Sequence, residues 1–413
     1  MKFLNRVNIR EWLILSIAFF LPLSPRILPF LIIILVSEWC FDSKFVVKFK
    51  AVLNYKYILL FISLYIAYLI GMFYTSNLSH GFADLETKLT LLLMPLLFSV
   101  IPINRNLIKK TINAFLAGNF TAITICFSIA IFRNIEVPYS DLFVSSHLSY
   151  FLQISYFAMY LTFACFLLLQ KIFASTDFFK KVFFIFLFIL ASVFIFLLSS
   201  KMGVIALILV VLVFLILQMV RLKRFILGGS ILGLFLIFSL ITFFKSPIIA
   251  ARFMHDYKSF TSDIENYESV GSSGLRVISW KSAFRIFSEN PFIGVGTGDF
   301  KDKMLKHYEE DGYMRLLELQ LNAHNQFLQT AGSLGIVGLI ILLSSLLILL
   351  YLSIKHKNII YFFFLFIIML NFTSESMLER QAGVIFYAFF NSLLFFSMIK
   401  NKTTNDTLFP PKN

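Results

Sequence analysis

Two side chains in the polar stretch between residues 272 and 338 could do chemistry on an anionic substrate. His324 stands in the sequence Asn-Ala-His-Asn-Gln, directly before a long apolar run. A histidine can accept a proton at neutral pH because its unperturbed pKa is about 6.5. Arg276 precedes it, and a guanidinium binds phosphate in a forked, bidentate way. These residue types predict proton transfer beside a bound phosphate.

A histidine before a helix is also a common capping or packing residue, so both interpretations of His324 stay open at this point. We count its neighbour Asn325 and the more distant His147 among the candidate residues for binding substrate. No histidine or carboxylate pair has a spacing typical of zinc ligands, so the sequence predicts no metal site. Cysteines occur only within apolar runs, where they are typical small buried hydrophobes.

Lys201 places a charge between two apolar runs, in the sequence Ser-Ser-Lys-Met-Gly. The simple interpretation is a turn between two spans, with the lysine reaching toward water. The functional interpretation is a cation at the mouth of a cavity that holds an anionic ligand. The residues alone leave both open.

Glu375, Glu379 and Arg380 lie in the sequence Thr-Ser-Glu-Ser-Met-Leu-Glu-Arg-Gln. The two glutamates are four residues apart and would share one face of a helix. An ordinary loop with a local ion pair would explain them, and an exposed pair of this kind is worth less than about 1 kcal/mol. The alternative is a network that positions a cation or a sugar. Arg276, Lys201 and Arg380, with a histidine nearby, favour an anionic substrate.

The elements that must position these residues are membrane helices. The chain has 413 residues, of which 59% are hydrophobic and only 14% charged, with 53 Phe. A soluble fold cannot bury that much apolar surface, so we predict an all-α polytopic membrane protein. A span needs about 20 apolar residues. Twelve spans are predicted, at 11–24, 27–41, 56–74, 87–103, 107–132, 148–169, 182–199, 203–220, 225–245, 334–353, 359–373 and 382–399.

Lysine and arginine mark one side of this topology. With the N-terminus inside, the inner segments carry 21 of these residues, whereas the short outer connectors carry only a few. By the positive-inside rule both termini are cytoplasmic and residues 246–333 face the outside. That outer segment has nine basic and eleven acidic residues, so the net charge of +14 reflects topology and does not indicate nucleic acid. The basic N-terminus enters the first span without a cleavage site, so we expect a retained anchor.

The predicted organisation has four parts. Spans one to nine occupy residues 1–245, a large helical periplasmic loop occupies 246–333, spans ten to twelve occupy 334–399, and a disordered cytoplasmic tail occupies 400–413. In the loop we expect an amphipathic helix over residues 275–288 and one or two short helices over 300–319. Between them, Gly294, Gly296 and Gly298 allow a sharp turn and a close approach to another surface.

The order of these motifs resembles the O-antigen ligase and polymerase superfamily of bacterial envelope glycosyltransferases. The resemblance rests on Arg276 with Trp280, the Pro-x-x-Gly-x-Gly turn, His324-Asn-x-x-Leu-Gln and Gly335-Ile-x-Gly. The Ser-Ser-Lys-x-Gly element and the closing Glu-x-x-x-Glu-Arg-Gln-x-Gly are also similar. It covers roughly residues 180–390.

The resemblance implies a ligase-like, metal-independent, inverting glycosyltransferase without a cofactor, in the bacterial inner membrane. The donor would be a glycan on undecaprenyl diphosphate, and the acceptor lipid A–core or a growing polysaccharide. His324 would take the proton from the acceptor hydroxyl, and Arg276 would clamp the diphosphate. Lys201 stands where the family more often has arginine, so it keeps the charge but loses the fork. We interpret Trp280 as a packing residue or lipid-interface anchor.

Three alternatives stay open. A polymerase of O-antigen or exopolysaccharide has the same expected residues, and a protein O-oligosaccharyltransferase differs from it in the acceptor. A permease without chemistry belongs to another class. It fits less well, because the sequence shows neither inverted repeats nor matched broken helices.

Overall fold

The computed structural model of the chain describes residues 2–41, 57–132, 148–222 and 272–400, with the isolated positions 229, 233 and 237. All regular structure in these residues is helical, which confirms the predicted all-α class. Within the same residues, six helices are long and apolar enough to cross a membrane. They are α7 (Arg105–Phe132), α9 (Ile154–Ala174), α10 (Phe178–Leu197), α11 (Lys201–Leu222), α17 (Gln326–Lys355) and α19 (Gln381–Lys400). The chain is therefore a multi-pass membrane protein.

Other predicted spans form shorter or less apolar helices. They are α1 (Lys2–Phe20), α2 (Leu28–Cys40), α4 (Ile58–Gly71) continued by the 3-10 turn η1 (Met72–Tyr74), and α18 (Ile359–Phe372). The predicted span at 225–245 lies outside the described residues apart from single positions. The number of twelve spans thus stays a prediction.

The predicted span at 87–103 is not one helix. The structure divides it into the end of α5 (Leu78–Lys88) and α6 (Thr90–Val100), which contains Pro95. With 11 residues, α6 is about 17 Å long and too short to cross a bilayer core of roughly 30 Å. Charged residues at the end of α5, among them Asp84 and Lys88, explain why the apolar segment starts late.

The centre of the bundle is formed by α9 and α19, which are buried on almost every face. Helix α9 packs against α7, α10, α11 and α18, and α19 packs against α6 and α18. Phenylalanine rings fill the space between them, with Phe163 in edge-to-face contact with Phe386 and Phe390. A helix that is apolar all round is a buried helix, which accounts for much of the phenylalanine content.

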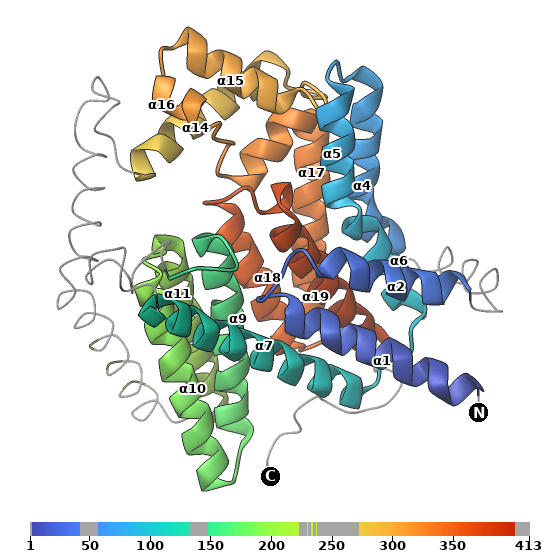
Figure 1. The fold of residues 1–413 in the computed structure, drawn as a ribbon, viewed down its shortest axis with the longest axis vertical. Helices are drawn as coiled ribbons and strands as arrows, with labels where there is room; N and C mark the ends of the chain where they lie inside the picture. The colour runs from blue at the N-terminus through green and yellow to red at the C-terminus, as the bar shows by residue number, and fades with distance from the viewer. Residues whose placement is uncertain are drawn as a thin grey trace.

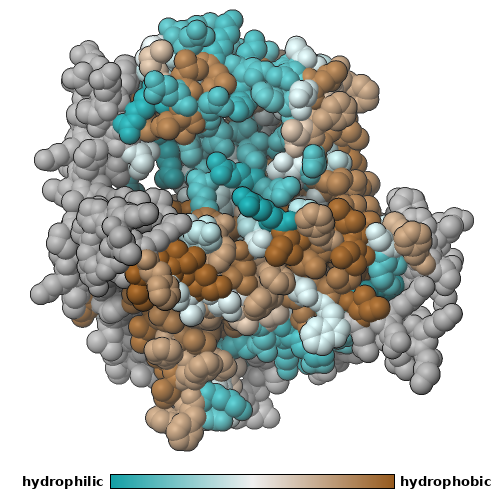
Figure 2. All heavy atoms as spheres, in the orientation of Figure 1, coloured by the Kyte–Doolittle hydropathy of each residue, from teal (hydrophilic) through white to brown (hydrophobic). Residues whose placement is uncertain are grey.

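Three helices form a polar layer at one end of the bundle (Figure 1). They are α14 (Ser272–Glu289), α15 (Phe300–Glu310) and α16 (Met314–Glu318), and they confirm the helices predicted for this segment. A small apolar core that includes Ile278, Met304 and Tyr308 holds them together. Hydrophilic residues gather over much of this end, with apolar patches among them, and apolar residues predominate below it (Figure 2). Helix α14 also packs against α17, which connects the polar layer to the bundle.

The glycine-rich turn closes onto a break in α17. Gly335 inside this helix has a φ of 66° and a ψ of −164°, so the helix is interrupted there. The backbone N–H of Ile336 donates to Pro291 at 2.7 Å, and that of Val295 donates to Gly332 at 3.1 Å. A Cβ added at Gly294 would lie 2.4 Å from the backbone of Ser333. The close approach predicted for the glycine turn is therefore confirmed.

Candidate active site

His324 lies in the turn that leads into α17 and has an unusual backbone. Its φ is 44°, in the left-handed region that costs a residue with a side chain about 1–2 kcal/mol. The turn is held at both peptide groups of the histidine: the N–H donates to Asn322 Oδ1 at 3.0 Å, and the carbonyl accepts from Trp280 Nε1 at 3.2 Å. The neighbouring Asn325 caps α17. The backbone conformation of His324 and its hydrogen bonds therefore set the direction of the imidazole.

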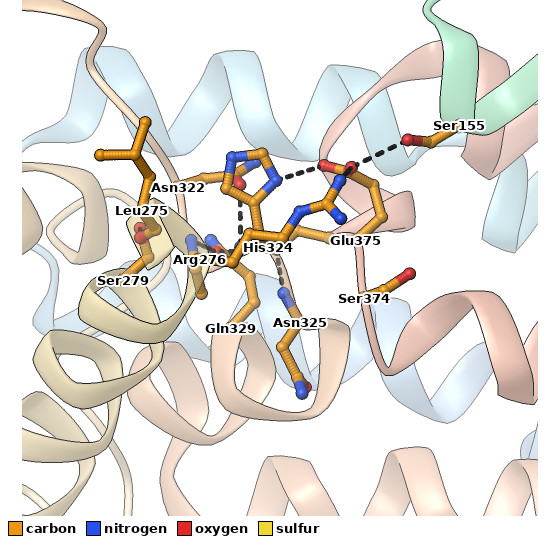
Figure 3. Close-up of polar contacts among 12 residues, drawn as sticks. Ser155, Leu275, Arg276, Ser279, Asn322, His324, Asn325, Gln329, Ser374 and Glu375 are labelled. Carbon is orange, nitrogen blue, oxygen red and sulfur yellow. Dashed lines mark hydrogen bonds and ion pairs between the residues drawn. The ribbon is translucent and has the colours of Figure 1, made fainter. Parts of the chain in front are cut away.

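The His324 side chain points at a buried carboxylate. His324 Nδ1 lies 2.8 Å from Glu375 Oε1, and the Glu375 side chain is only 3% exposed. Glu375 comes from the segment between α18 and α19, 51 positions further along the chain. The same carboxylate accepts a hydrogen bond from Ser155 of α9 at 3.2 Å (Figure 3). Three segments that are distant in sequence thus meet at one carboxyl group.

Arg276 reaches the second oxygen of this carboxylate. Arg276 Nη2 lies 3.5 Å from Glu375 Oε2, and the arginine side chain is 25% exposed (Figure 3). Arg276 and Trp280 lie one turn apart on one face of α14, as their spacing predicts. Arg276 contacts Glu375, and Trp280 contacts the backbone of His324. In the part of the chain that the structure describes, the guanidinium is paired only with Glu375, through Nη2, and its other N–H groups have no partner there.

The negative charge of Glu375 determines which nitrogen of His324 carries the proton that the two groups share. Burial alone would raise the pKa of the Glu375 carboxyl, but the hydrogen bond and charge of His324, with Arg276 and Ser155, hold this pKa below its usual value of 4.5. Glu375 is therefore ionised at neutral pH and can only accept hydrogen bonds. Nδ1 of His324 therefore donates the shared proton, and in the neutral tautomer that carries this proton the lone pair is on Nε2.

Lys201 is the first residue of α11 and lies near the start of α14. Its Nζ donates to Ser273 Oγ at 2.7 Å, three residues before Arg276 on the same helix. The structure thus brings two of the predicted cations to one helical turn. Lys201 is also the first residue of a helix long enough to span the membrane. This position is equally compatible with the simple interpretation, a turn between two spans.

Arg380 is exposed directly after the 3-10 turn η4 (Met377–Glu379). Among the described residues it has no ion-pair partner. Asn325 uses its side chain structurally: its Oδ1 accepts from the N–H groups of Phe327 and Leu328, and its Nδ2 donates to the Thr373 carbonyl at 3.1 Å. His147 lies outside the described residues.

Two glutamines hold the segment of Glu375 in place: Gln329, which belongs to the His324-Asn-x-x-Leu-Gln motif but was given no role, and Gln326, which was not selected from the sequence. The Leu378 N–H donates to Gln326 Oε1 at 2.7 Å, and Ser376 Oγ donates to Gln329 Oε1 at 3.4 Å. Ser155 was also not selected. The available signal was the pair of amide side chains three residues apart at the polar start of an apolar helix, since buried amides need partners.

A metal ion has no evident ligands near this site. Within residues 2–41, 57–132, 148–222 and 272–400, no group of three or more His, Cys, Asp or Glu side chains is placed to hold one. The charged groups that the structure brings together are one carboxylate, one imidazole and two basic side chains.

The fold and site define a multi-pass membrane protein with an imidazole–carboxylate–guanidinium cluster at its polar end. The family model described as O-antigen ligase matches residues 186–343 of this chain. The match runs from α10 into α17, so it contains Arg276 and His324, and it confirms the predicted resemblance to the O-antigen ligase superfamily. Glu375 and Arg380 lie beyond the matched residues. A comparison with curated proteins found no match.

Proposed function

We propose that the chain is an inverting glycosyltransferase that moves a glycan from undecaprenyl diphosphate to a hydroxyl group of lipid A–core. One observation carries this proposal: a single carboxylate, Glu375, holds the candidate base His324 at one oxygen and the candidate phosphate ligand Arg276 at the other. Base and cation are therefore fixed relative to each other, as a displacement between two bound substrates requires.

His324 acts on the acceptor. Its Nε2 takes the proton of the acceptor hydroxyl as the oxygen attacks the anomeric carbon of the donor sugar. Glu375 stabilises the imidazolium that results, because its carboxylate remains hydrogen-bonded to Nδ1. A positioned general base of this kind contributes typically 10²–10⁴-fold to the rate.

Arg276 acts on the donor. As the new glycosidic bond forms, the bond from the anomeric carbon to the diphosphate oxygen breaks, and its electron pair stays on undecaprenyl diphosphate. The guanidinium stabilises the charge that develops there. Diphosphate is already a good leaving group, so this half of the reaction needs no general acid. Attack opposite the leaving group inverts the anomeric configuration.

Lys201 and Arg380 add positive charge around the same anion. Lys201 contacts the helix that carries Arg276, and Arg380 follows Glu375 by five residues and is exposed. In this proposal they bind the diphosphate or an acidic glycan. Asn325 orients the His324 turn, and the polar layer faces the periplasm, where lipid-linked glycans are the available donors. The membrane is the bacterial inner membrane.

Purified protein tests this proposal directly. The protein is incubated with glycan on undecaprenyl diphosphate, once with lipid A–core and once without it, and the products are separated by mass. Glycosylated lipid A–core is expected, with none from the His324→Ala variant. Lengthening of the lipid-linked chain would identify a polymerase instead, and glycan transfer to neither acceptor would refute the proposal.

A further inference from the structure

A second charged cluster lies buried beside the candidate site and has no part in the proposed chemistry. Lys88, the last residue of α5, is fully buried. Its ammonium group forms ion pairs with Asp84, one turn earlier on α5, and with Glu379 Oε1 at 2.9 Å. It also lies 4.5 Å from the centre of the Tyr68 ring, a cation–π contact.

The number of carboxylates in this cluster is more than charge balance requires. A buried ammonium destabilises the fold strongly unless it is paired, so Lys88 needs one carboxylate. Asp84 supplies it from the same helix, four residues away. Burial and then the nearby Glu379 raise the pKa of the Asp84 carboxyl to about 7, so the second carboxyl group beside Lys88 has an electrostatic cost. The burial of Lys88 therefore does not explain the Lys88–Glu379 ion pair. The explanation lies in the segment that carries Glu379.

That segment is the one that carries Glu375. The Met377 N–H donates to the Glu375 carbonyl at 3.0 Å, and the Glu379 N–H donates to the Ser376 carbonyl at 3.1 Å. These bonds make residues 375–379 one tight turn, so its two glutamates move together. At one end Glu375 meets His324, and at the other end Glu379 meets Lys88.

We propose that the Lys88–Glu379 ion pair positions Glu375 for the reaction. Helix α5 holds the far end of the turn through Lys88, and the near end then presents its carboxylate to both His324 and Arg276. Glu379 is in this sense a positioning residue that acts through Glu375 and touches no substrate. The kinetic consequence rests on the proposed function, whereas the placement of Glu375 does not.

The two carboxylates around Lys88 provide a matched pair of variants. Glu379→Leu and Asp84→Leu each remove one carboxylate and leave Lys88 paired with the other, so both are expected to fold and insert. Only Glu379→Leu removes the ion pair between Lys88 of α5 and the Glu375 turn. We expect its kcat to fall at least tenfold with an unchanged KM for the lipid-linked donor, and we expect Asp84→Leu to stay within threefold of the unchanged protein. Equal losses in the two variants would show that the cluster is only structural and would overturn the proposal.

A chemical readout separates this proposal from the proposed function. Diethyl pyrocarbonate modifies the free imidazole nitrogen, and its rate at His324 is measured by peptide mass spectrometry at fixed pH without any substrate. Glu379→Leu is expected to shift this rate toward that of Glu375→Gln, and to have no further effect when combined with it. An unchanged rate in Glu379→Leu, or fully additive effects, would overturn the positioning role. The expected rates in a protein that transfers no glycan would refute only the proposed function.

Discussion

Trp280 donates its indole N–H to the backbone carbonyl of His324 at 3.2 Å. The sequence led us to interpret this tryptophan as a packing or interface residue, and the structure adds a contact with the candidate base itself. Because His324 has a left-handed backbone, its turn needs such external support. The contact joins α14, which carries Arg276, to the turn that carries His324.

Trp280→Phe should therefore reduce transfer moderately. A smaller aromatic ring remains and one hydrogen bond is lost, which corresponds to about 0.5–1.5 kcal/mol and a fall in kcat of roughly 2–13-fold. The matched control is Trp12→Phe, because Trp12 is 69% exposed on α1. The measurement is the transfer rate at saturating donor and acceptor. Equal rates for both variants would show that Trp280 does not support the His324 turn.

His324→Ala should abolish transfer while the protein still inserts. The loss of a general base predicts a fall of about 10²–10⁴-fold. His80→Ala is the control, since this histidine lies on α5 with its side chain 46% exposed. Insertion is checked by protease accessibility in membranes. Near-normal transfer by His324→Ala would end its assignment as the base.

Arg276→Lys should reduce kcat/KM for the lipid-linked donor about 10²-fold, because lysine keeps the charge but cannot bind phosphate with a fork. The control on the same helix is Arg285→Lys, whose residue pairs with Glu289 and Asp311 on the outer surface. The loss should also exceed that of Trp280→Phe. If the two arginine variants behave alike, Arg276 has a structural role only.

Glu375 should make stability depend on pH in a defined direction. Its folded pKa is below 4.5, so ionisation of this carboxyl stabilises the fold. The contribution is complete above pH 4.5 and is lost as the pH falls through the lower folded value. The difference in Tm between the unchanged protein and Glu375→Gln should therefore shrink as detergent solutions are acidified from pH 7 to below 4. Ser374→Ala, which titrates nothing, should show a constant difference, and a Glu375→Gln difference that grows on acidification would contradict the assigned shift.

Gly294 and Gly312 both have a positive φ but differ in their surroundings. Alanine variants at the two positions therefore distinguish the cost of backbone strain from the cost of a steric clash. Gly294 and Gly312 have φ values of 71° and 74°, but an added Cβ meets the Ser333 backbone at 2.4 Å in the first and nothing within 4 Å in the second. Gly312→Ala should cost about 1–2 kcal/mol, the backbone term alone. Gly294→Ala should cost clearly more and lower Tm further, since the glycine turn can no longer dock on α17. Equal shifts in Tm would mean that the turn yields easily.

Local pattern was enough to predict the helices of the polar layer and most membrane helices. Periodicity over residues 275–288 corresponds to α14, and hydropathy located α9, α10 and α11. The break at Gly335 was not predicted, because a glycine in an apolar run is equally compatible with a continuous helix. It becomes visible only when the Pro291–Gly298 turn supplies partners for the freed N–H groups.

The candidate site was predictable in its members but not in its connections. His324 and Arg276 were selected by residue type and by resemblance. For Glu375 the sequence left two interpretations open, an ordinary loop with a local ion pair or a network that positions a cation or a sugar. The contacts that Glu375 makes with His324 and Arg276 span 51 and 99 residues of sequence. Such separations are fixed by the packing of whole helices, and no local spacing rule reports them. The same reason hid the pairing of Lys88 with Glu379.

The interruption of α17 has a mechanical consequence. A membrane helix that meets a thicker or thinner bilayer responds by tilting. The part of α17 beyond Gly335 is a span of this kind, but the glycine turn is bonded to both sides of the break. The Val295 N–H donates to the Gly332 carbonyl before it, and the Ile336 N–H donates to the Pro291 carbonyl after it. We infer that a tilt of this span carries the glycine turn with it, so that bilayer thickness is coupled to the position of the polar layer.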